Sequence, residues 1–265
     1  MTAKAPRPRI DHVARLTGPD GPFAVRDGAL VVGGVEARQL AAEHGTPLFA
    51  YDEAAIAARI RQVRGVLPER FSLFYSIKAN PNAAVLRLAL ANGCGLEVAS
   101  GGELFQALAA GCAPENVIFA GPGKTEAELV AAVEGGIGEI HVEAVDEIDA
   151  VARIAAERGT QARVALRINP VGSAGGAMRM GGAPSPFGID EEDLDAALDR
   201  ALSHSAIAVT GVHLFMGTQI LDARTLVEQY RTAVALAGRV AARVGPLASV
   251  PVRAISPDAA WMLTS

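Results

Sequence analysis

The sequence predicts an α/β fold in which parallel strands alternate with covering helices, and a closed barrel is the favoured arrangement. From about residue 46 of the 265, short apolar runs alternate with longer Ala- and Leu-rich segments of helical period. That rhythm is typical of parallel strands covered by helices. Nearly every run ends in a polar residue, and a barrel gathers such ends on one face. An open doubly wound sheet has the same rhythm but would spread these ends along an edge, so it explains less.

The expected elements follow one another through short turns, several of which carry a glycine suited to a helix end. The expected strands lie at 47–52, 71–79, 95–100, 117–121, 139–144, 163–169 and 208–216. The expected helices span 53–66, 82–92, 101–111, 124–134, 145–158, 190–203 and 222–243. The polar residues at or just after strand ends are Lys78, Glu97, Ser100, Lys124, Glu143, Arg167, Asn169, His213 and Thr218.

Charge and composition exclude several classes of protein. The net charge is -5 and no basic run occurs, which argues against a nucleic-acid-binding surface. The N-terminal positive charges have no apolar segment behind them, and no stretch reaches the roughly 18 apolar residues that span a membrane. Cys94 and Cys112 show no metal-like spacing with histidine. We expect both to be reduced, buried side chains of a cytoplasmic protein.

One apolar run carries a charge that needs an explanation. Residues 71–79 read as a buried strand that ends near Lys78, before Asn80 and Pro81 stop the run. Burying an unpaired ammonium is costly, so Lys78 has either a partner and a role or a route to the surface along its own stem. The strand alone favours neither reading.

Other local motifs have ordinary structural readings. Gly121-Pro-Gly-Lys-Thr125 resembles the end of a phosphate loop, but Ile118 stands where that motif needs its first glycine, so a strand-to-helix turn is favoured. Ser100 with Glu103 has the spacing of a helix N-cap and capping box. A lone histidine such as His213 after an apolar strand is more often a core residue than a ligand.

Several motifs in a fixed order carry a resemblance to a known family. They are Tyr75-Ser-Ile-Lys-Ala-Asn80, Gly95-Leu-Glu-Val-Ala-Ser-Gly-Gly-Glu103, Ala165-Leu-Arg-Ile-Asn-Pro170, Met178-Arg-Met-Gly-Gly182 with Phe187-Gly-Ile-Asp190, and Gly211-Val-His-Leu-Phe-Met-Gly-Thr-Gln219. Together they resemble the fold-type III pyridoxal-phosphate decarboxylases, the diaminopimelate and ornithine decarboxylase group. The nearest resemblance is to diaminopimelate-decarboxylase-like proteins associated with exosortase systems. The implied fold is a TIM-like (β/α)8 barrel of the alanine-racemase type.

The resemblance implies a role for each matching position. Lys78 corresponds to the lysine that carries pyridoxal 5'-phosphate as a Schiff base, and Glu97 and Arg167 would lie near the cofactor ring. Gly217 and Thr218 correspond to the phosphate side of the site. The histidine that usually stacks on the ring is replaced by Phe215, which can stack but cannot form hydrogen bonds. His213 corresponds to the family's other histidine on that strand.

The resemblance also implies an organisation that this chain matches in part. Residues 1–45 would be an N-terminal segment contributing to the family's β-domain, and 46–247 the cofactor-binding barrel. Members of the family continue with a strand that ends in Gly-Gly-Gly and a strand that ends in E-P-G-R, and a β-domain follows. Residues 248–265 match neither strand, as a truncation or a shifted reading frame would produce, and the β-domain would be missing.

The expected activity is decarboxylation of a diaminopimelate-like or carrier-linked α-amino acid by a homodimer. Two alternatives stay open. One is an impaired homologue that binds cofactor or a full-length partner, and the other is a barrel-only cofactor carrier or racemase-like protein.

Overall fold

The computed structural model describes residues 23–171, 178–179, 186–218 and 222–245, and they fall into two compact units. The first unit, Met1–Pro68, contains a small antiparallel sheet of β1 (Ala24–Arg26), β2 (Ala29–Val32) and β3 (Val35–Glu36), then α2 (Ala37–His44) and α3 (Glu53–Val66). The expected strand at 47–52 is wrong, because this segment is irregular. Pro47 lacks an amide donor, and no described strand lies beside the segment to pair with it.

The second unit, Glu69–Ser265, is built on parallel strands that neighbour one another in chain order. They are β4 (Phe74–Ser76), β5 (Gly95–Val98), β6 (Val117–Phe119), β7 (Glu139–Val142), β8 (Ala162–Asn169) and β11 (Ile207–Leu214). A doubly wound sheet reverses its strand order at a switch point, and this sheet does not. Among the described residues β4 and β11 are the two ends of the series, so they form an arc of a barrel-type sheet.

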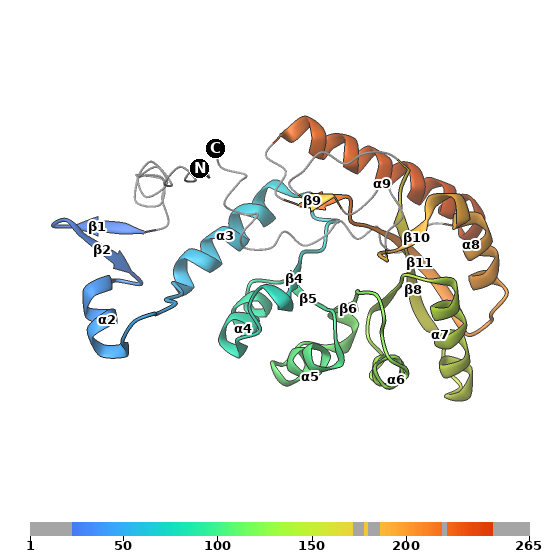
Figure 1. The fold of residues 1–265 in the computed structure, drawn as a ribbon, viewed down its shortest axis with the longest axis horizontal. Coiled ribbons are helices and arrows are strands. Elements are labelled where there is room, and N and C mark those ends of the chain that lie inside the picture. Colours follow the sequence, from blue (N-terminus) through green and yellow to red (C-terminus); the bar gives the residue numbers. More distant parts are fainter. Residues whose placement is uncertain (1–22, 172–177, 180–185, 219–221, 246–265) are drawn as a thin grey trace, which may run out of the picture. The chain divides into compact units, whose positions relative to one another are not determined.

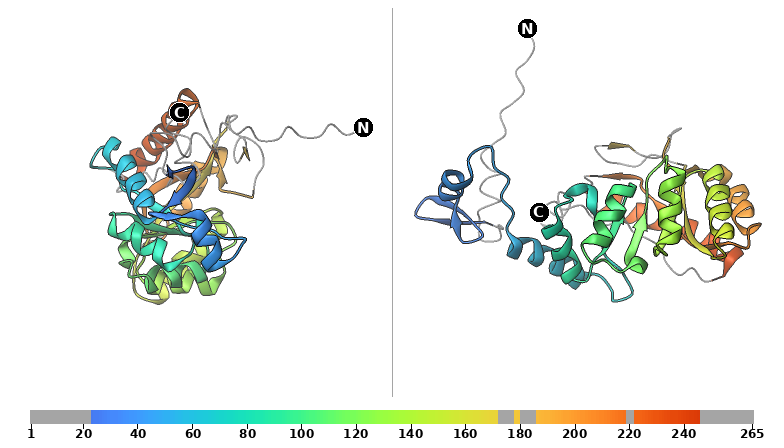
Figure 2. Two further views of the ribbon diagram at one scale, coloured as in Figure 1. Left: turned by 90° about the vertical axis from the view of Figure 1, so that its left-hand side faces the viewer. Right: turned by 90° about the horizontal axis from the view of Figure 1, so that it is seen from below.

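The helices of this unit lie along the outer face of that arc (Figures 1 and 2). They are α4 (Ala83–Ala91), α5 (Gly101–Ala109), α6 (Glu126–Glu134), α7 (Val145–Glu157), α8 (Leu194–Leu202) and α9 (Ala223–Val244). Their apolar sides and the strands enclose the core, whose largest buried side chains include Phe119, Ile77, Leu86, Leu96, Ile140, Ile148, Ile154, Leu166 and Ile168. None of the described helices is both long and apolar enough to span a bilayer.

Side-chain caps fix where several helices begin, and therefore where the preceding strand-to-helix turns end. The Oγ of Ser100 accepts a hydrogen bond from the amide of Glu103 at 3.2 Å, which confirms the expected N-cap of α5. The Glu103 carboxylate reaches back to the amide of Ala99 at 2.7 Å rather than to that of Ser100. Thr125 and Glu128 form a complete capping box at the start of α6.

Several short elements lie between the main strands and helices. The strand expected at 71–79 stops at Ser76, and the chain continues into a 3-10 turn, η1 (Ile77–Ala79). Further 3-10 turns are η2 (Pro114–Asn116) and η3 (Glu191–Asp193). β10 (Ile189–Asp190) pairs with the end of β8, and β9 (Met178–Arg179) pairs antiparallel with β12 (Gly217–Thr218). Cys94 and Cys112 are buried, as expected, and neither is in a disulfide in the described structure.

Candidate active site

Two charged pairs lie at the C-terminal ends of the parallel strands. We call Lys78 and Glu97, after β4 and on β5, the lysine corner, and Glu143 and Arg167, after β7 and on β8, the arginine corner. The C-terminal face is where enzymes of barrel architecture place their sites. Among the strand-end residues that the sequence singled out, the described structure pairs Lys78 with Glu97 and Glu143 with Arg167.

The lysine corner is loosely engaged. Because β4 ends at Ser76, Lys78 lies in η1 rather than in the strand, which corrects the expected strand position. Ser76 is in register with Glu97 on β5, and this register brings the Lys78 Nζ to 3.9 Å from the Glu97 Oε1. The side chain of Lys78 is 49% exposed, whereas that of Glu97 is 7% exposed. The amine thus has both a carboxylate neighbour and an open side.

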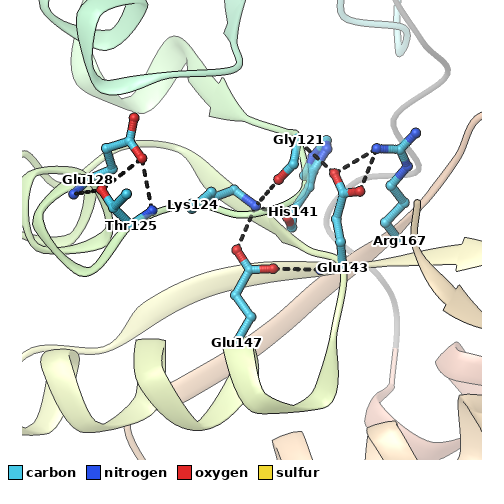
Figure 3. Close-up of polar contacts among 8 residues, drawn as sticks. All are labelled: Gly121, Lys124, Thr125, Glu128, His141, Glu143, Glu147 and Arg167. Carbon is cyan, nitrogen blue, oxygen red and sulfur yellow. Dashed lines mark hydrogen bonds and ion pairs between the residues drawn. The ribbon is translucent and has the colours of Figure 1, made fainter. Parts of the chain in front are cut away.

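The arginine corner is tightly paired (Figure 3). The Arg167 Nη1 lies 2.6 Å from both carboxylate oxygens of Glu143, and both side chains are buried. The amide of Gly121, at the end of β6, donates to the Glu143 Oε1 at 2.6 Å. Charge-assisted hydrogen bonds of this length are strong and fix the orientation of both groups.

Two aromatic rings flank the same guanidinium. The Arg167 Cζ lies 5.1 Å from the ring centroid of Phe187 and 5.9 Å from that of Phe215. Both distances fall within the range of cation–π attraction. Phe215 follows β11 directly, and its ring lies beside Arg167.

The other residues predicted for the site lie on β11 and in β12. His213, on β11, is in register with Arg167 and is buried, with its ring centroid 4.5 Å from that of His141. The His141 Nε2 lies 3.2 Å from the Glu139 Oε2, so His213 adjoins a buried histidine–carboxylate pair. Gly217 and Thr218 form β12, although the Thr218 side chain lies outside the described residues.

Sequence reasoning missed two contributors to the arginine corner. Glu143 was among the polar strand ends but received no role, although its position directly after an apolar strand was a usable signal. Phe187 follows a glycine-rich stretch whose path no local pattern predicts. The turn reading of 121–125 agrees with the structure, because the Lys124 Nζ contacts protein oxygens and its side chain is 1% exposed.

The scarcity of lysine makes Lys78 distinctive. The sequence contains three lysines, Lys4, Lys78 and Lys124. Lys124 is enclosed in a buried ion pair with Glu147, and Lys4 lies outside the described residues. Lys78 is therefore the one amine of the described lysines that solvent or a ligand can reach.

Comparison with known proteins identifies the family. The sequence model described as "Pyridoxal-dependent decarboxylase, pyridoxal binding domain" matches residues 53–247. The chain is 40% identical over 201 residues to the L-glutamyl-[BtrI acyl-carrier protein] decarboxylase of Niallia circulans, covering 76% of this chain and 47% of that protein. It is 34% identical over 207 residues to the diaminopimelate decarboxylase of Zymomonas mobilis, covering 76% of this chain and 49% of the relative.

Solved structures agree with the sequence relatives. The diaminopimelate decarboxylase of M. jannaschii, crystallised with L-lysine, superposes with a TM-score of 0.70 at 29% identity, over 82% of this chain and 54% of that one. The chain spans about half the length of the curated relatives it matches. The expected barrel class and cofactor class are confirmed, while the exosortase-associated subgroup stays a prediction. The chain belongs to the fold-type III pyridoxal-phosphate decarboxylases, in the diaminopimelate-decarboxylase-like branch, and it contains their pyridoxal-binding domain.

Proposed function

We propose that this chain is the pyridoxal-phosphate-binding part of a decarboxylase that acts at the α-carbon of an amino acid. The observation that carries the proposal is the lysine corner, where a half-exposed amine lies 3.9 Å from a buried carboxylate at the C-terminal ends of parallel strands. A cofactor aldehyde requires such a reachable primary amine. When bound, pyridoxal phosphate supplies the electron sink for the charge left at the α-carbon after loss of carbon dioxide.

The fit of the residues to this cofactor rests on an incompletely satisfied carboxylate. Within the described part of the chain, Glu97 makes one ion-pair contact, to Lys78, and no hydrogen bond. A buried carboxylate stabilises a nearby cation and is costly when left without hydrogen bonds. Glu97 therefore fits a role beside a cationic ligand group, holding the Lys78 amine toward the site.

The arginine corner supplies complementary groups. Both Arg167 contacts to Glu143 use Nη1, which leaves the guanidinium's other edge directed away from that carboxylate (Figure 3). Phe215 offers a flat apolar face against which an aromatic ring can stack. We assign Arg167 to orienting an anionic or ring oxygen, Phe215 to ring stacking, His213 to the wall behind them, and Gly217 with Thr218 to the phosphate side.

The substrate class follows from the relatives. We propose an α-amino acid that is either free and diaminopimelate-like or tethered to a carrier protein. The second class is supported by 40% identity to a decarboxylase of a carrier-linked glutamate. We further propose a cytoplasmic homodimer for the complete protein. We also propose that its N-terminal segment is 1–45, its barrel region 46–247 and its atypical tail 248–265.

The deciding experiment is to map which lysine takes up the cofactor. The purified chain is mixed with pyridoxal phosphate, its visible spectrum is recorded, and the linkage is fixed with borohydride before peptide mass spectrometry. We expect a band of lysine-bound cofactor and a reduced adduct on Lys78. Lys78→Ala should lose both, and Lys4→Ala should keep both, which makes it the matched control.

Other outcomes bear on the alternatives. An adduct on Lys4 alone, or an equal band in Lys78→Ala, would reject the assigned site. Binding through Lys78 with no release of carbon dioxide from any amino acid tested would favour the impaired homologue or the cofactor carrier. A carrier-tethered amino acid that turns over while the free one does not would settle the substrate class.

A further inference from the structure

We propose that Glu147, paired with Lys124, is a positioning residue that holds Glu143, and through it Arg167, in the orientation the site requires. From sequence, the turn that carries Lys124 is favoured as an ordinary strand-to-helix turn, and in the structure the Lys124 amine contacts Gly121, His141 and Glu147. The proposal concerns how the arginine corner is built, and it adds to the proposed function because it depends on Arg167 taking part in the site.

Lys124 closes a buried ring of hydrogen bonds (Figure 3). Its Nζ donates to the backbone oxygen of Gly121 at 2.8 Å, to that of His141 at 2.7 Å and to the Oε1 of Glu147 at 2.7 Å. All three donor hydrogens of the ammonium are therefore used within the protein. A fully satisfied buried ammonium has no capacity left for a ligand, so Lys124 acts on its protein neighbours.

Glu147 carries the connection to the site. Its second oxygen, Oε2, accepts the amide of Glu143 at 2.8 Å. The carboxylate of the same residue Glu143 accepts the amide of Gly121 and the Nη1 of Arg167, each at 2.6 Å. Glu143 is thus fixed at its backbone by Glu147 and at its side chain by Gly121, whose own carbonyl is held by Lys124.

A simpler reading is that Glu147 only caps α7. It lies in the first turn of that helix, whose N-cap, Ala144, makes no side-chain cap hydrogen bond. A cap of that kind would stabilise the helix without affecting Arg167. The arrangement differs from a plain cap because the capped amide belongs to the residue that binds Arg167. The same ring also fixes both the N–H and the C=O of Gly121, a strand away. Closed hydrogen-bond networks of this kind restrict the rotamers of every member.

Paired substitutions separate the two readings. Removing one member would strand a buried charge, whereas replacing both charges by apolar groups is often neutral for folding. Lys124→Met with Glu147→Met removes the acceptor for the Glu143 amide. Lys124→Met with Glu147→Gln keeps a side-chain oxygen for that amide and is the matched control. Thermal unfolding identifies the variants that remain folded.

The primary readout is the reactivity of Arg167, which does not depend on cofactor. Phenylglyoxal labels accessible guanidinium groups, and peptide mass spectrometry reports each arginine separately. We expect labelling of Arg167 to rise about tenfold in the Met–Met variant through local opening, and to stay near the parent value in the Met–Gln variant. Arg163, which is exposed on the same strand and donates to Gly138, should be unchanged in both.

The second readout is the visible spectrum and affinity of bound pyridoxal phosphate. We expect the Met–Met variant to bind about tenfold more weakly, the lower end of the loss caused by removing outer partners at metal sites. Restoration by the Met–Gln variant would assign the effect to the Glu143 amide. If the parent binds no cofactor, the proposed function fails, while the labelling of Arg167 still decides this inference.

Three results would overturn the inference. The first is a folded Met–Met variant with parental Arg167 labelling. The second is a Met–Gln variant that behaves like Met–Met. The third needs no variant: hydrogen exchange of the parent chain should show slow amides at Gly121 and Glu143, and fast exchange at both would mean that the ring is not formed.

Discussion

The two corners of the site use the same kinds of charge in opposite ways. At the arginine corner the guanidinium and carboxylate are both buried and 2.6 Å apart, and an outer ion pair supports them. At the lysine corner the amine is half exposed and lies 3.9 Å from its carboxylate. The ion pair of the arginine corner is fully formed within the chain, whereas the amine of the lysine corner is only loosely paired and remains accessible.

This difference separates an ion pair that stabilises the fold from an amine that is free to react. Buried ion pairs are costly to desolvate, so they persist only when hydrogen bonds satisfy each partner, as Gly121 and Glu147 do around Glu143. A group that must react cannot be satisfied in this way before its substrate arrives. The incomplete pairing of Lys78 and Glu97 is therefore the feature expected of a reactive position.

The same isosteric change at each corner should give the largest contrast. Glu143→Gln leaves the guanidinium of Arg167 buried without its counter-charge, and we expect a loss of about 3–5 kcal/mol in the free energy of unfolding. Glu97→Gln removes a buried charge whose pairing is weak, so the change should stay within about 1 kcal/mol of the parent. Urea unfolding at pH 7, followed by circular dichroism, measures both.

The more stable of the two variants, Glu97→Gln, should bind the cofactor less well than Glu143→Gln. Glu97→Gln, although folded, should weaken retention of pyridoxal phosphate on Lys78. Equal stability losses in the two variants would mean that the corners do not differ as described. A stabilised Glu143→Gln would show that desolvation of that pair outweighs its attraction.

A glycine beside the arginine corner provides the next contrast. Gly188 has φ +82, and a Cβ there would lie 3.0 Å from the carbonyl oxygen of Arg167 and 3.3 Å from its Cγ. Gly188→Ala should therefore cost about 2–3 kcal/mol, from backbone strain together with displacement of β8. Gly123→Ala is the matched control, because its φ is +71 but no atom lies within 4 Å of the new Cβ.

Strain alone predicts about 1 kcal/mol for the control. Chemical denaturation of both variants gives the difference, and labelling of Arg167 should increase in Gly188→Ala alone. Equal losses would mean that the contact with β8 relaxes freely. Gly188 would then have no specific role in positioning Arg167.

The sequence predicted the parts of this architecture that depend on local pattern. The strand-helix rhythm located β5 to β8 and the helices from α3 to α9 to within a few residues, because apolar periodicity and caps such as Ser100 act locally, whereas α2 was not predicted. It placed Lys78 in a strand, since the residues before it are apolar, whereas the chain turns at Ser76. It also assigned a strand to 47–52, where no partner strand is described.

The partners across the site could not be predicted in this way. Glu143, Gly121 and Arg167 are brought together by strand order, and Phe187 by the return of the chain after a glycine-rich stretch. No spacing within one element encodes these contacts. Lys78, Glu97 and Arg167 were found because a family motif records them, while the Lys124–Glu147 pair became visible only with the side chains in place.

The smallest predicted effect concerns Glu128, which joins the start of α5 to the start of α6. Glu128 accepts the amide of Gly101, at the start of the helix after β5, at 2.7 Å. It also accepts the amide of Thr125, next to Lys124, at 2.8 Å. These hydrogen bonds, that from Gly101 first, lower the pKa of the Glu128 carboxyl. Glu128→Gln keeps one acceptor oxygen, so we expect a loss of about 1 kcal/mol at pH 7.

The pH dependence of that loss tests its cause. A carboxyl whose folded-state pKa is lowered stabilises the fold fully above its unfolded pKa, about 4.3, and loses the contribution as pH falls through the folded value. The difference between parent and Glu128→Gln should therefore narrow below about pH 4. Glu126→Gln, an exposed change on the same helix, should cost less than about 0.5 kcal/mol at pH 7. A Glu128→Gln loss that persists unchanged in acid would mean that the shape of the Glu128 side chain, rather than its charge, joins the starts of α5 and α6.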